Sequence, residues 1–193
     1  MNAEELKIKQ ERVTFGFWIY LMTDLLMFAV LFAAYAVLRN NTFGGPSIKE
    51  IFDPPYVLIE TFILLTSSLT SGLGVLYATA RDKNKTLIYF GATFLLGFIF
   101  LAMEIYEFSH LLSEGHSWQT SGFLSSYFGL VGTHGVHITA GLIWLGILLT
   151  HVYLKGINNS NLGKLKLLSI FWHFLDIVWI FIFTIVYLLG GIL

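Results

Sequence analysis

Apolar residues dominate five long stretches of this chain, and short polar segments separate them. The stretches cover Phe15–Leu38, Val57–Thr79, Leu87–Leu111, Phe123–Val152 and Leu167–Leu189. Each is longer than about 18 residues, the length at which a largely apolar run indicates a transmembrane helix. The pattern therefore predicts an all-α, polytopic membrane protein, a bundle of five transmembrane helices forming a single membrane domain over residues 1–193.

The segments between the stretches carry residues typical of turns and helix ends. Asp53–Pro55 precedes the second stretch, where proline suits a helix start, and Gly115 is a candidate C-terminal cap for the third. Arg81–Lys85 is read as a charged hairpin, and Asn158–Asn161 as the loop before the fifth stretch. These short connections favour helices that are neighbours along the chain and in space.

Composition agrees with a membrane protein and excludes several other classes. Charged residues make up 12% of the 193 residues, against about 25% in soluble domains. The net charge of −1 provides no basic field that would recruit nucleic acid. Cysteine is absent, which excludes disulfides, thiolate metal sites and cysteine nucleophiles.

Basic residues predict the orientation of the bundle. Nine lysines and arginines fall in the N-terminal segment, in the loop after the second stretch and around the loop before the fifth. The opposite side has only Arg39 and Lys49. Because positive charge collects on the cytoplasmic side, we expect a cytoplasmic N-terminus and a C-terminus outside.

Titratable side chains interrupt all five apolar stretches. A charge at the centre of a lipid-facing helix costs about 2.5–3.5 kcal/mol on insertion scales, so we expect these groups to face another helix, a partner subunit or water. The candidate contact residues are Asp24, Glu60, Glu104, Glu107, His134, His137, His173 and Asp176.

Counting along the helices gives these groups different depths. Glu60, like His110, falls near the outer edge, where an interfacial position explains it. Asp24 and Asp176 each come out roughly 14 Å above the inner edge, with His173 about one turn lower. A shared polar layer of these three is expected if the first and fifth helices are close.

Two patterns allow metal binding, but packing is the preferred interpretation of both. Glu107–His110 is a Glu-x-x-His motif of the kind found in di-iron bundles, yet such a site needs a second copy. His134 and His137 are three residues apart and could share a ligand. Thr66–Gly72 is rich in hydroxyls and glycine, which suits close helix packing better than a conduction path.

Five ordered motifs make the chain resemble subunit III of the haem–copper respiratory oxidases. They are Phe15–Asp24, Glu60–Ser68, Met103–Phe108, Gly132–His137 and Phe171–Trp179. The similarity is greatest to the five-helix form found in cytochrome bo-type quinol oxidases. Asp24 aligns with the family's carbodiimide-reactive carboxyl, which is usually glutamate in the seven-helix cytochrome c oxidase members.

The resemblance implies a non-catalytic subunit of a proton-pumping terminal quinol oxidase, which oxidises quinol and reduces oxygen to water. It implies no haem, copper or other metal in this chain, with these cofactors in partner subunit I. It further implies contacts with subunits I, II and IV, bound phospholipid, a quinol site elsewhere in the complex, and a bacterial inner membrane.

Other functions stay open on the residues alone. Subunit III of a cytochrome c oxidase is the alternative within the same family. A small proton-coupled transporter would use Asp24, Glu104, His137 and Asp176, although internal repeats and broken helices are not evident. A membrane metalloenzyme would use Glu104, Glu107, His110, His134 and His137.

Overall fold

The computed structural model describes residues 3–45, 51 and 54–192 of the chain. Among these residues, five helices are long and apolar enough to cross a membrane, and no strand is present. The predicted all-α bundle of five transmembrane helices is confirmed. Lys49 and Asp53, which entered the sequence argument, lie outside the described residues.

The five spans run well beyond the apolar stretches. Helix α1 covers Ala3–Leu38, α3 Pro54–Thr79, α4 Lys83–Ser113 and α5 Gly122–Lys155. The last span begins as α6, Asn159–Ile182, and continues through the π-helical segment η1, Phe183–Leu188, into α7, Leu189–Ile192. A run of apolar residues marks only the part of a helix that lies in lipid, so the polar turns at the helix ends are not predicted from it.

Capping side chains explain where the helices begin. The Asn158 side chain accepts a hydrogen bond of 2.7 Å from the Asn161 backbone N–H, and α6 therefore starts at Asn159 rather than after the expected loop. Asp82 caps α4 and Ser121 caps α5 in the same way. Gly115 follows the end of α4 with φ +85°, a backbone conformation that favours glycine.

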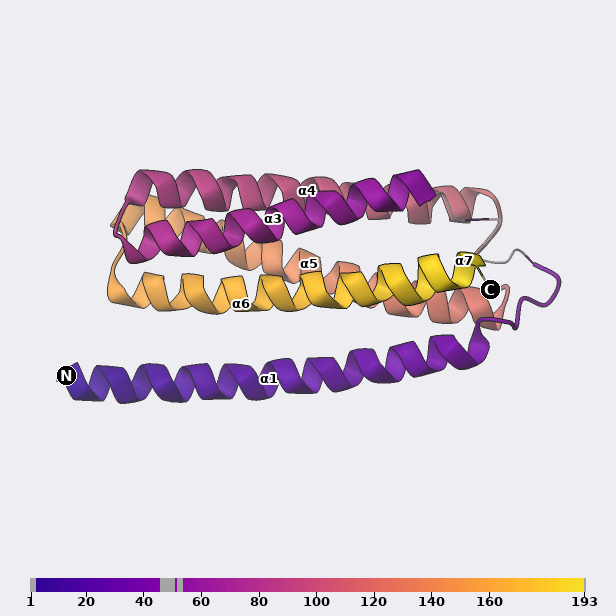
Figure 1. Cartoon of the computed structure of the whole chain (residues 1–193), viewed down its shortest axis with the longest axis horizontal. Helices are drawn as coiled ribbons and strands as arrows, with labels where there is room; N and C mark the ends of the chain where they lie inside the picture. Colours follow the sequence, from indigo (N-terminus) through magenta and orange to yellow (C-terminus); the bar gives the residue numbers. More distant parts are fainter. Residues whose placement is uncertain (1–2, 46–50, 52–53, 193) are drawn as a thin grey trace.

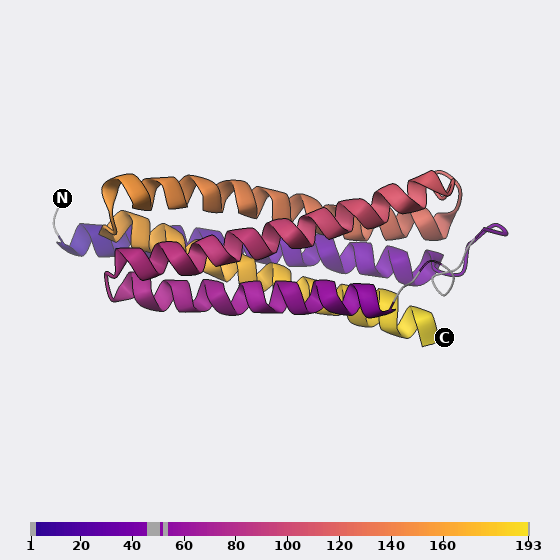
Figure 2. The ribbon, with the colours of Figure 1, turned by 90° about the horizontal axis from the view of Figure 1, so that it is seen from above.

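The helices form a layered bundle with α1 along one side. Helices α3 and α4 form a hairpin, α3 packs on α6, and α5 packs on both α4 and α6. Helix α1 lies against α5 and α6. It forms the lower edge of Figure 1, and in Figure 2 it runs along the bundle, partly hidden by the helices in front of it. The start of α1, the α3–α4 turn and the α5–α6 loop share one end of the bundle, and the C-terminus lies at the other (Figure 1).

Trp172 belongs to the larger of two clusters of buried apolar side chains and lies where three helices meet. Its side chain is 1% exposed. A Cβ built on Gly97 of α4 would lie 2.6 Å from Trp172 Cζ2, and one on Gly141 of α5 would lie 3.0 Å from Cζ3. The absence of side chains at these two glycines therefore makes room for the indole ring of α6.

Candidate functional site

Hydroxyl groups of α3 form a polar seam with α6. Trp172 Nε1 donates to Ser67 Oγ at 3.0 Å, and Ser71 donates to Ser169 at the same distance. Nearer the other end of the seam, Trp179 Nε1 donates to Thr61 Oγ1 at 3.1 Å. These hydroxyls are used to hold two helices together, which supports the packing interpretation of the α3 pattern.

His173 and Asp176 flank the same seam, on its outer side. Ser68 Oγ lies 2.7 Å from His173 Nδ1, and the Asp176 carboxyl is a neighbour of the same hydroxyl. The pair thus contacts α3. Asp176 is 8% exposed and His173 is exposed.

Asp24 forms a separate pair with α5. Its Oδ2 atom lies 3.6 Å from His137 Nε2, and His137 Nδ1 lies 2.8 Å from the Thr133 carbonyl oxygen. Both side chains are largely buried, with 12% and 16% of their surface exposed. Asp24 contacts α5, whereas His173 contacts α3, so Asp24 is paired with His137 and not with the His173–Asp176 pair. The shared depth of these groups stays a prediction.

Three glutamates gather inside the bundle. Glu60, Glu104 and Glu107 interact electrostatically with one another. Glu60 is 0% exposed, so it faces the interior of the bundle and not its surface, while its depth in the membrane stays a prediction. Counting along an axis gives depth but not the side of the helix that a residue occupies. His110, by contrast, is exposed and lies 3.5 Å from Glu114.

Two tyrosines that the sequence argument missed surround Glu107. Tyr127 donates to Glu107 Oε1 at 2.9 Å, and Tyr187 donates to the same oxygen at 3.4 Å. Their own hydroxyls are 2.9 Å apart. Both tyrosines are buried. A signal was available, since a tyrosine deep in an apolar helix needs a polar partner for its hydroxyl.

His134 lies in an aromatic enclosure. Its ring stacks on Trp179 at a centroid distance of 5.3 Å and meets the edge of Phe100 at 5.9 Å. It is fully buried, and neither ring nitrogen has a hydrogen-bond partner within the described part of the chain. His134 therefore serves aromatic packing in this arrangement.

The side chains proposed as metal ligands do not converge. His137 pairs with Asp24, His134 stacks on Trp179, and His110 lies beside Glu114. Over residues 3–45, 51 and 54–192, no three His, Cys, Asp or Glu side chains are grouped to hold a metal ion. The contacts of His137 and His134 join two helices each, and that of His110 lies at the end of α4.

Replacing Glu60 with glutamine is expected to leave thermal stability unchanged or to raise it. Within the described residues, neither carboxyl oxygen of Glu60 has a hydrogen-bond partner, so the isosteric amide removes a potential charge without breaking a bond. The neighbouring Thr61→Val is the control. It removes the acceptor of Trp179 N–H and should cost about 1–3 kcal/mol. Equal losses of Tm in the purified subunit would contradict this account.

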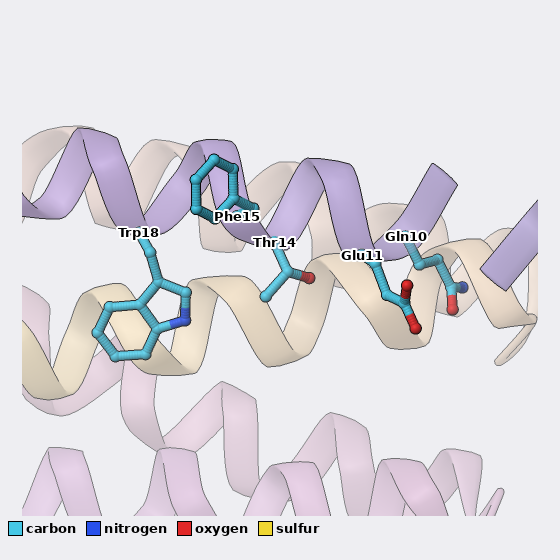
Figure 3. Close-up of a pocket in the computed structure, with 5 residues that line it drawn as sticks. All are labelled: Gln10, Glu11, Thr14, Phe15 and Trp18. Atoms are coloured by element: carbon cyan, nitrogen blue, oxygen red, sulfur yellow. The ribbon is translucent and has the colours of Figure 1, made fainter. Parts of the chain in front are cut away.

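The N-terminal half of α1 carries polar and aromatic groups at a surface hollow of about 490 Å³. Gln10, Glu11, Thr14, Phe15 and Trp18 line it, as Figure 3 shows. Phe15 and Trp18 are 69% and 52% exposed. Such a mixture is typical of the membrane–water interface, where Trp anchors a helix.

A second, larger hollow of about 660 Å³ lies between the start of α1 and the start of α6. Gln10, Val13 and Thr14 line one side, and Lys164 and Lys166 are among the residues on the other. Apolar side chains, among them Leu167 and Ile170, continue the lining toward the membrane interior. The two cationic groups make this end suited to an anionic head group.

The sequence is similar to known proteins along nearly its whole length. The model of the family described as cytochrome c oxidase subunit III matches residues 4–191. The chain is 53% identical over 178 residues to cytochrome bo(3) ubiquinol oxidase subunit 3 of Pseudomonas aeruginosa, covering 92% of this chain and 85% of the relative.

Other relatives carry related names. Cytochrome c oxidase subunit 3 of Bacillus sp. strain PS3 is 46% identical over 91% of this chain and 84% of its own length. Probable quinol oxidase subunit 3 of Staphylococcus saprophyticus is 43% identical, with 91% and 88% covered. The resemblance drawn from the five motifs is confirmed. The chain belongs to the cytochrome c oxidase subunit III family, and it is a subunit of a haem–copper oxidase.

Proposed function

We propose that this chain is the non-catalytic subunit III of a proton-pumping terminal quinol oxidase in a bacterial inner membrane. The match to the family over residues 4–191 carries the proposal, and the 53% identity to a ubiquinol oxidase subunit favours quinol as the electron donor. The complex oxidises quinol and reduces oxygen to water. Its haems and copper belong to subunit I, which is the main partner, with subunits II and IV also present.

The polar groups in the spans support a structural role for this chain. Asp24 pairs with His137, and Glu107 with Tyr127, so these groups join helices. Glu60, Glu104 and His134 are buried without a path of hydrogen bonds linking them among the described residues. We assign the eight candidate residues to contacts within the bundle, with lipid or with neighbouring subunits, rather than to catalysis.

Phospholipid is part of the proposed role. The hollow between α1 and α6 combines Lys164 and Lys166 with an apolar continuation at Leu167 and Ile170. A phosphate head group would lie at the lysines, with acyl chains toward the membrane interior. The lysines lie on the side expected to be cytoplasmic, which gives an inner-leaflet lipid.

The orientation follows from charge. The start of α1, the α3–α4 turn and the α5–α6 loop lie at one end of the bundle (Figure 1), and they carry nine of the eleven lysines and arginines. We assign this end to the cytoplasm and the C-terminus to the periplasm or exterior.

Subunit III of a cytochrome c oxidase is the second candidate, because the 46% identical relative from Bacillus sp. strain PS3 bears that name. Mild-detergent purification through a tag on this chain separates the two. We expect copurifying haem and copper subunits, extractable quinone, and oxygen uptake driven by quinol. Uptake driven by reduced cytochrome c alone would favour the second candidate. Purification of the chain without haem subunits would contradict both.

A further inference from the structure

Glu60 of α3, Glu104 of α4 and His134 of α5 have more buried polar atoms than hydrogen bonds. We call these three residues the interior polar cluster. Glu60 and His134 are 0% exposed, and Glu104 is 4% exposed. Within residues 3–45, 51 and 54–192, both carboxyl oxygens of Glu60, one of Glu104 and both ring nitrogens of His134 have no hydrogen-bond partner. Each such atom is destabilising unless a bound molecule satisfies it.

The three residues lie in one part of the bundle interior. Glu60 and Glu104 interact electrostatically. A Cβ built on Gly135, which follows His134, would lie 3.0 Å from Glu104 Oε2, so this carboxyl lies against α5. Trp179 connects α5 with α3, since its ring stacks on His134 and its N–H donates to the residue after Glu60. Unmatched polar atoms of three helices are therefore neighbours.

The nearby donors of this chain are already used elsewhere. Tyr127 and Tyr187 donate to Glu107, and Tyr56 donates to a backbone carbonyl of α4. Among the described residues, no lysine or arginine interacts electrostatically with Glu60 or Glu104. The donors that these two carboxyls need must therefore come from a bound molecule.

The histidine restricts what that molecule can be. A neutral imidazole has one N–H donor and one bare nitrogen that accepts, so the ligand of His134 must both donate and accept. A metal ion accepts no hydrogen bond, and in the part of the chain that the structure describes no three such side chains are grouped to hold one. Water donates and accepts, and a buried water typically makes about three hydrogen bonds to otherwise unmatched polar groups.

We propose that the interior polar cluster is a binding site for water molecules, which bridge Glu60, Glu104 and His134. Water O–H groups donate to the carboxyl oxygens and to the bare nitrogen of His134, and a water oxygen accepts the imidazole N–H. The waters join side chains of three helices into one hydrogen-bonded network. This site lies inside the chain, apart from the hollow between α1 and α6, and does not depend on the electron donor of the complex.

X-ray radiolysis of the intact oxidase tests for bound water. Hydroxyl radicals that form from a buried water oxidise the side chains beside it, even where bulk solvent does not reach. Phe100 meets the ring of His134, whereas Phe90, also on α4, lies in an apolar cluster with Leu145. Both phenylalanines are 0% exposed, so they form a matched pair. We expect Phe100 to be oxidised at least about fivefold faster than Phe90.

A second matched pair comes from α6. Trp179 stacks on His134, whereas Trp172 lies against two glycines and donates to Ser67. The two indoles are 0% and 1% exposed. Trp179 should be oxidised at least about fivefold faster than Trp172. Equal oxidation rates within both pairs would overturn the proposal.

Substitutions show whether the polar atoms hold the water. Glu60→Leu and Glu104→Leu each remove hydrogen-bonding groups from the cluster and should slow oxidation of Phe100 by about threefold or more. Glu60→Gln keeps two polar atoms and should leave the rate unchanged. Unaltered oxidation in both leucine variants would overturn the proposal. If these variants do not assemble, the two matched pairs in the unmodified chain decide.

A metal ion as the occupant would give a different result. Elemental analysis of the purified chain, before and after the Glu104→Leu substitution, detects it. We expect no stoichiometric metal in either sample. One metal ion per chain that is lost with Glu104→Leu would overturn the assignment of water.

Discussion

Replacing Gly97 with leucine is expected to cost about 3 kcal/mol or more and to prevent normal assembly of the bundle. Even a Cβ at this position would lie 2.6 Å from Trp172 Cζ2, 2.8 Å from Cη2 and 3.2 Å from Leu142 Cδ2. Trp172 cannot move aside easily, because it is buried and its indole N–H donates to Ser67. Overpacking of a filled core costs about 1–3 kcal/mol in general, and an indole in close contact places this site at the upper end.

The same substitution at Gly91 is the matched control. Gly91 is also on α4, and a Cβ there meets no atom within 4 Å. Both variants replace one helical glycine with leucine, so the difference in Tm of the purified subunit isolates the contact with Trp172. At about 2–4 °C per kcal/mol for a chain of this size, we expect Gly97→Leu to melt roughly 10 °C below Gly91→Leu. Equal Tm values would contradict the packing around Trp172.

Hydropathy predicted the spans because burial in lipid imposes one simple requirement. Backbone groups in the hydrocarbon must be bonded within the helix, so each crossing needs a long apolar run. The starts of the helices do not obey this requirement. Asn159 begins α6 because Asn158 caps it, and a cluster of asparagines is equally typical of a loop.

The side-chain contacts between helices could be predicted from the sequence only in part. The hydroxyl pattern of α3 predicted close packing, and the bonds from Trp172 and Trp179 are consistent with it. The partner of Asp24 could not be found from depth, because the first helix lies against α5 as well as α6. The predicted layer placed Asp24 with Asp176 and His173 and left out His137, because the orientation of each helix about its axis is not visible in the sequence.

Glu60 is a second residue whose surroundings the sequence did not predict. Its place near one end of the span suggested the interface, whereas the structure buries it completely. The direction of a side chain around the helix is set by which faces pack, and the neighbours Thr61 and Leu64 are buried too. Packing against the other helices therefore decides which residues near a helix end are buried and which are exposed. The residues around Glu60 in the sequence do not reveal those contacts.

Replacing Trp179 with alanine is expected to be the other severe change, at about 3–5 kcal/mol, the usual cost of removing a buried large aromatic side chain. Trp179 is 0% exposed. It meets Phe100 edge to face at a centroid distance of 4.7 Å, stacks on His134 and donates to Thr61. Its loss opens a cavity between α3, α4, α5 and α6, so Tm should fall by about 10 °C or more.

Two further variants separate the causes of that loss. Trp179→Phe keeps an aromatic ring but removes the donor to Thr61 Oγ1. The lost hydrogen bond should cost about 1 kcal/mol of stability, and the cavity left by the smaller ring should cost less than the cavity left by alanine. Trp118→Ala removes an indole that is 52% exposed, and it should shift Tm by no more than a few degrees. If Trp179→Phe proved as damaging as Trp179→Ala, the hydrogen bond across the seam would outweigh the volume of the ring. If Trp118→Ala matched both, the seam between α3 and α6 would not be what holds this bundle together.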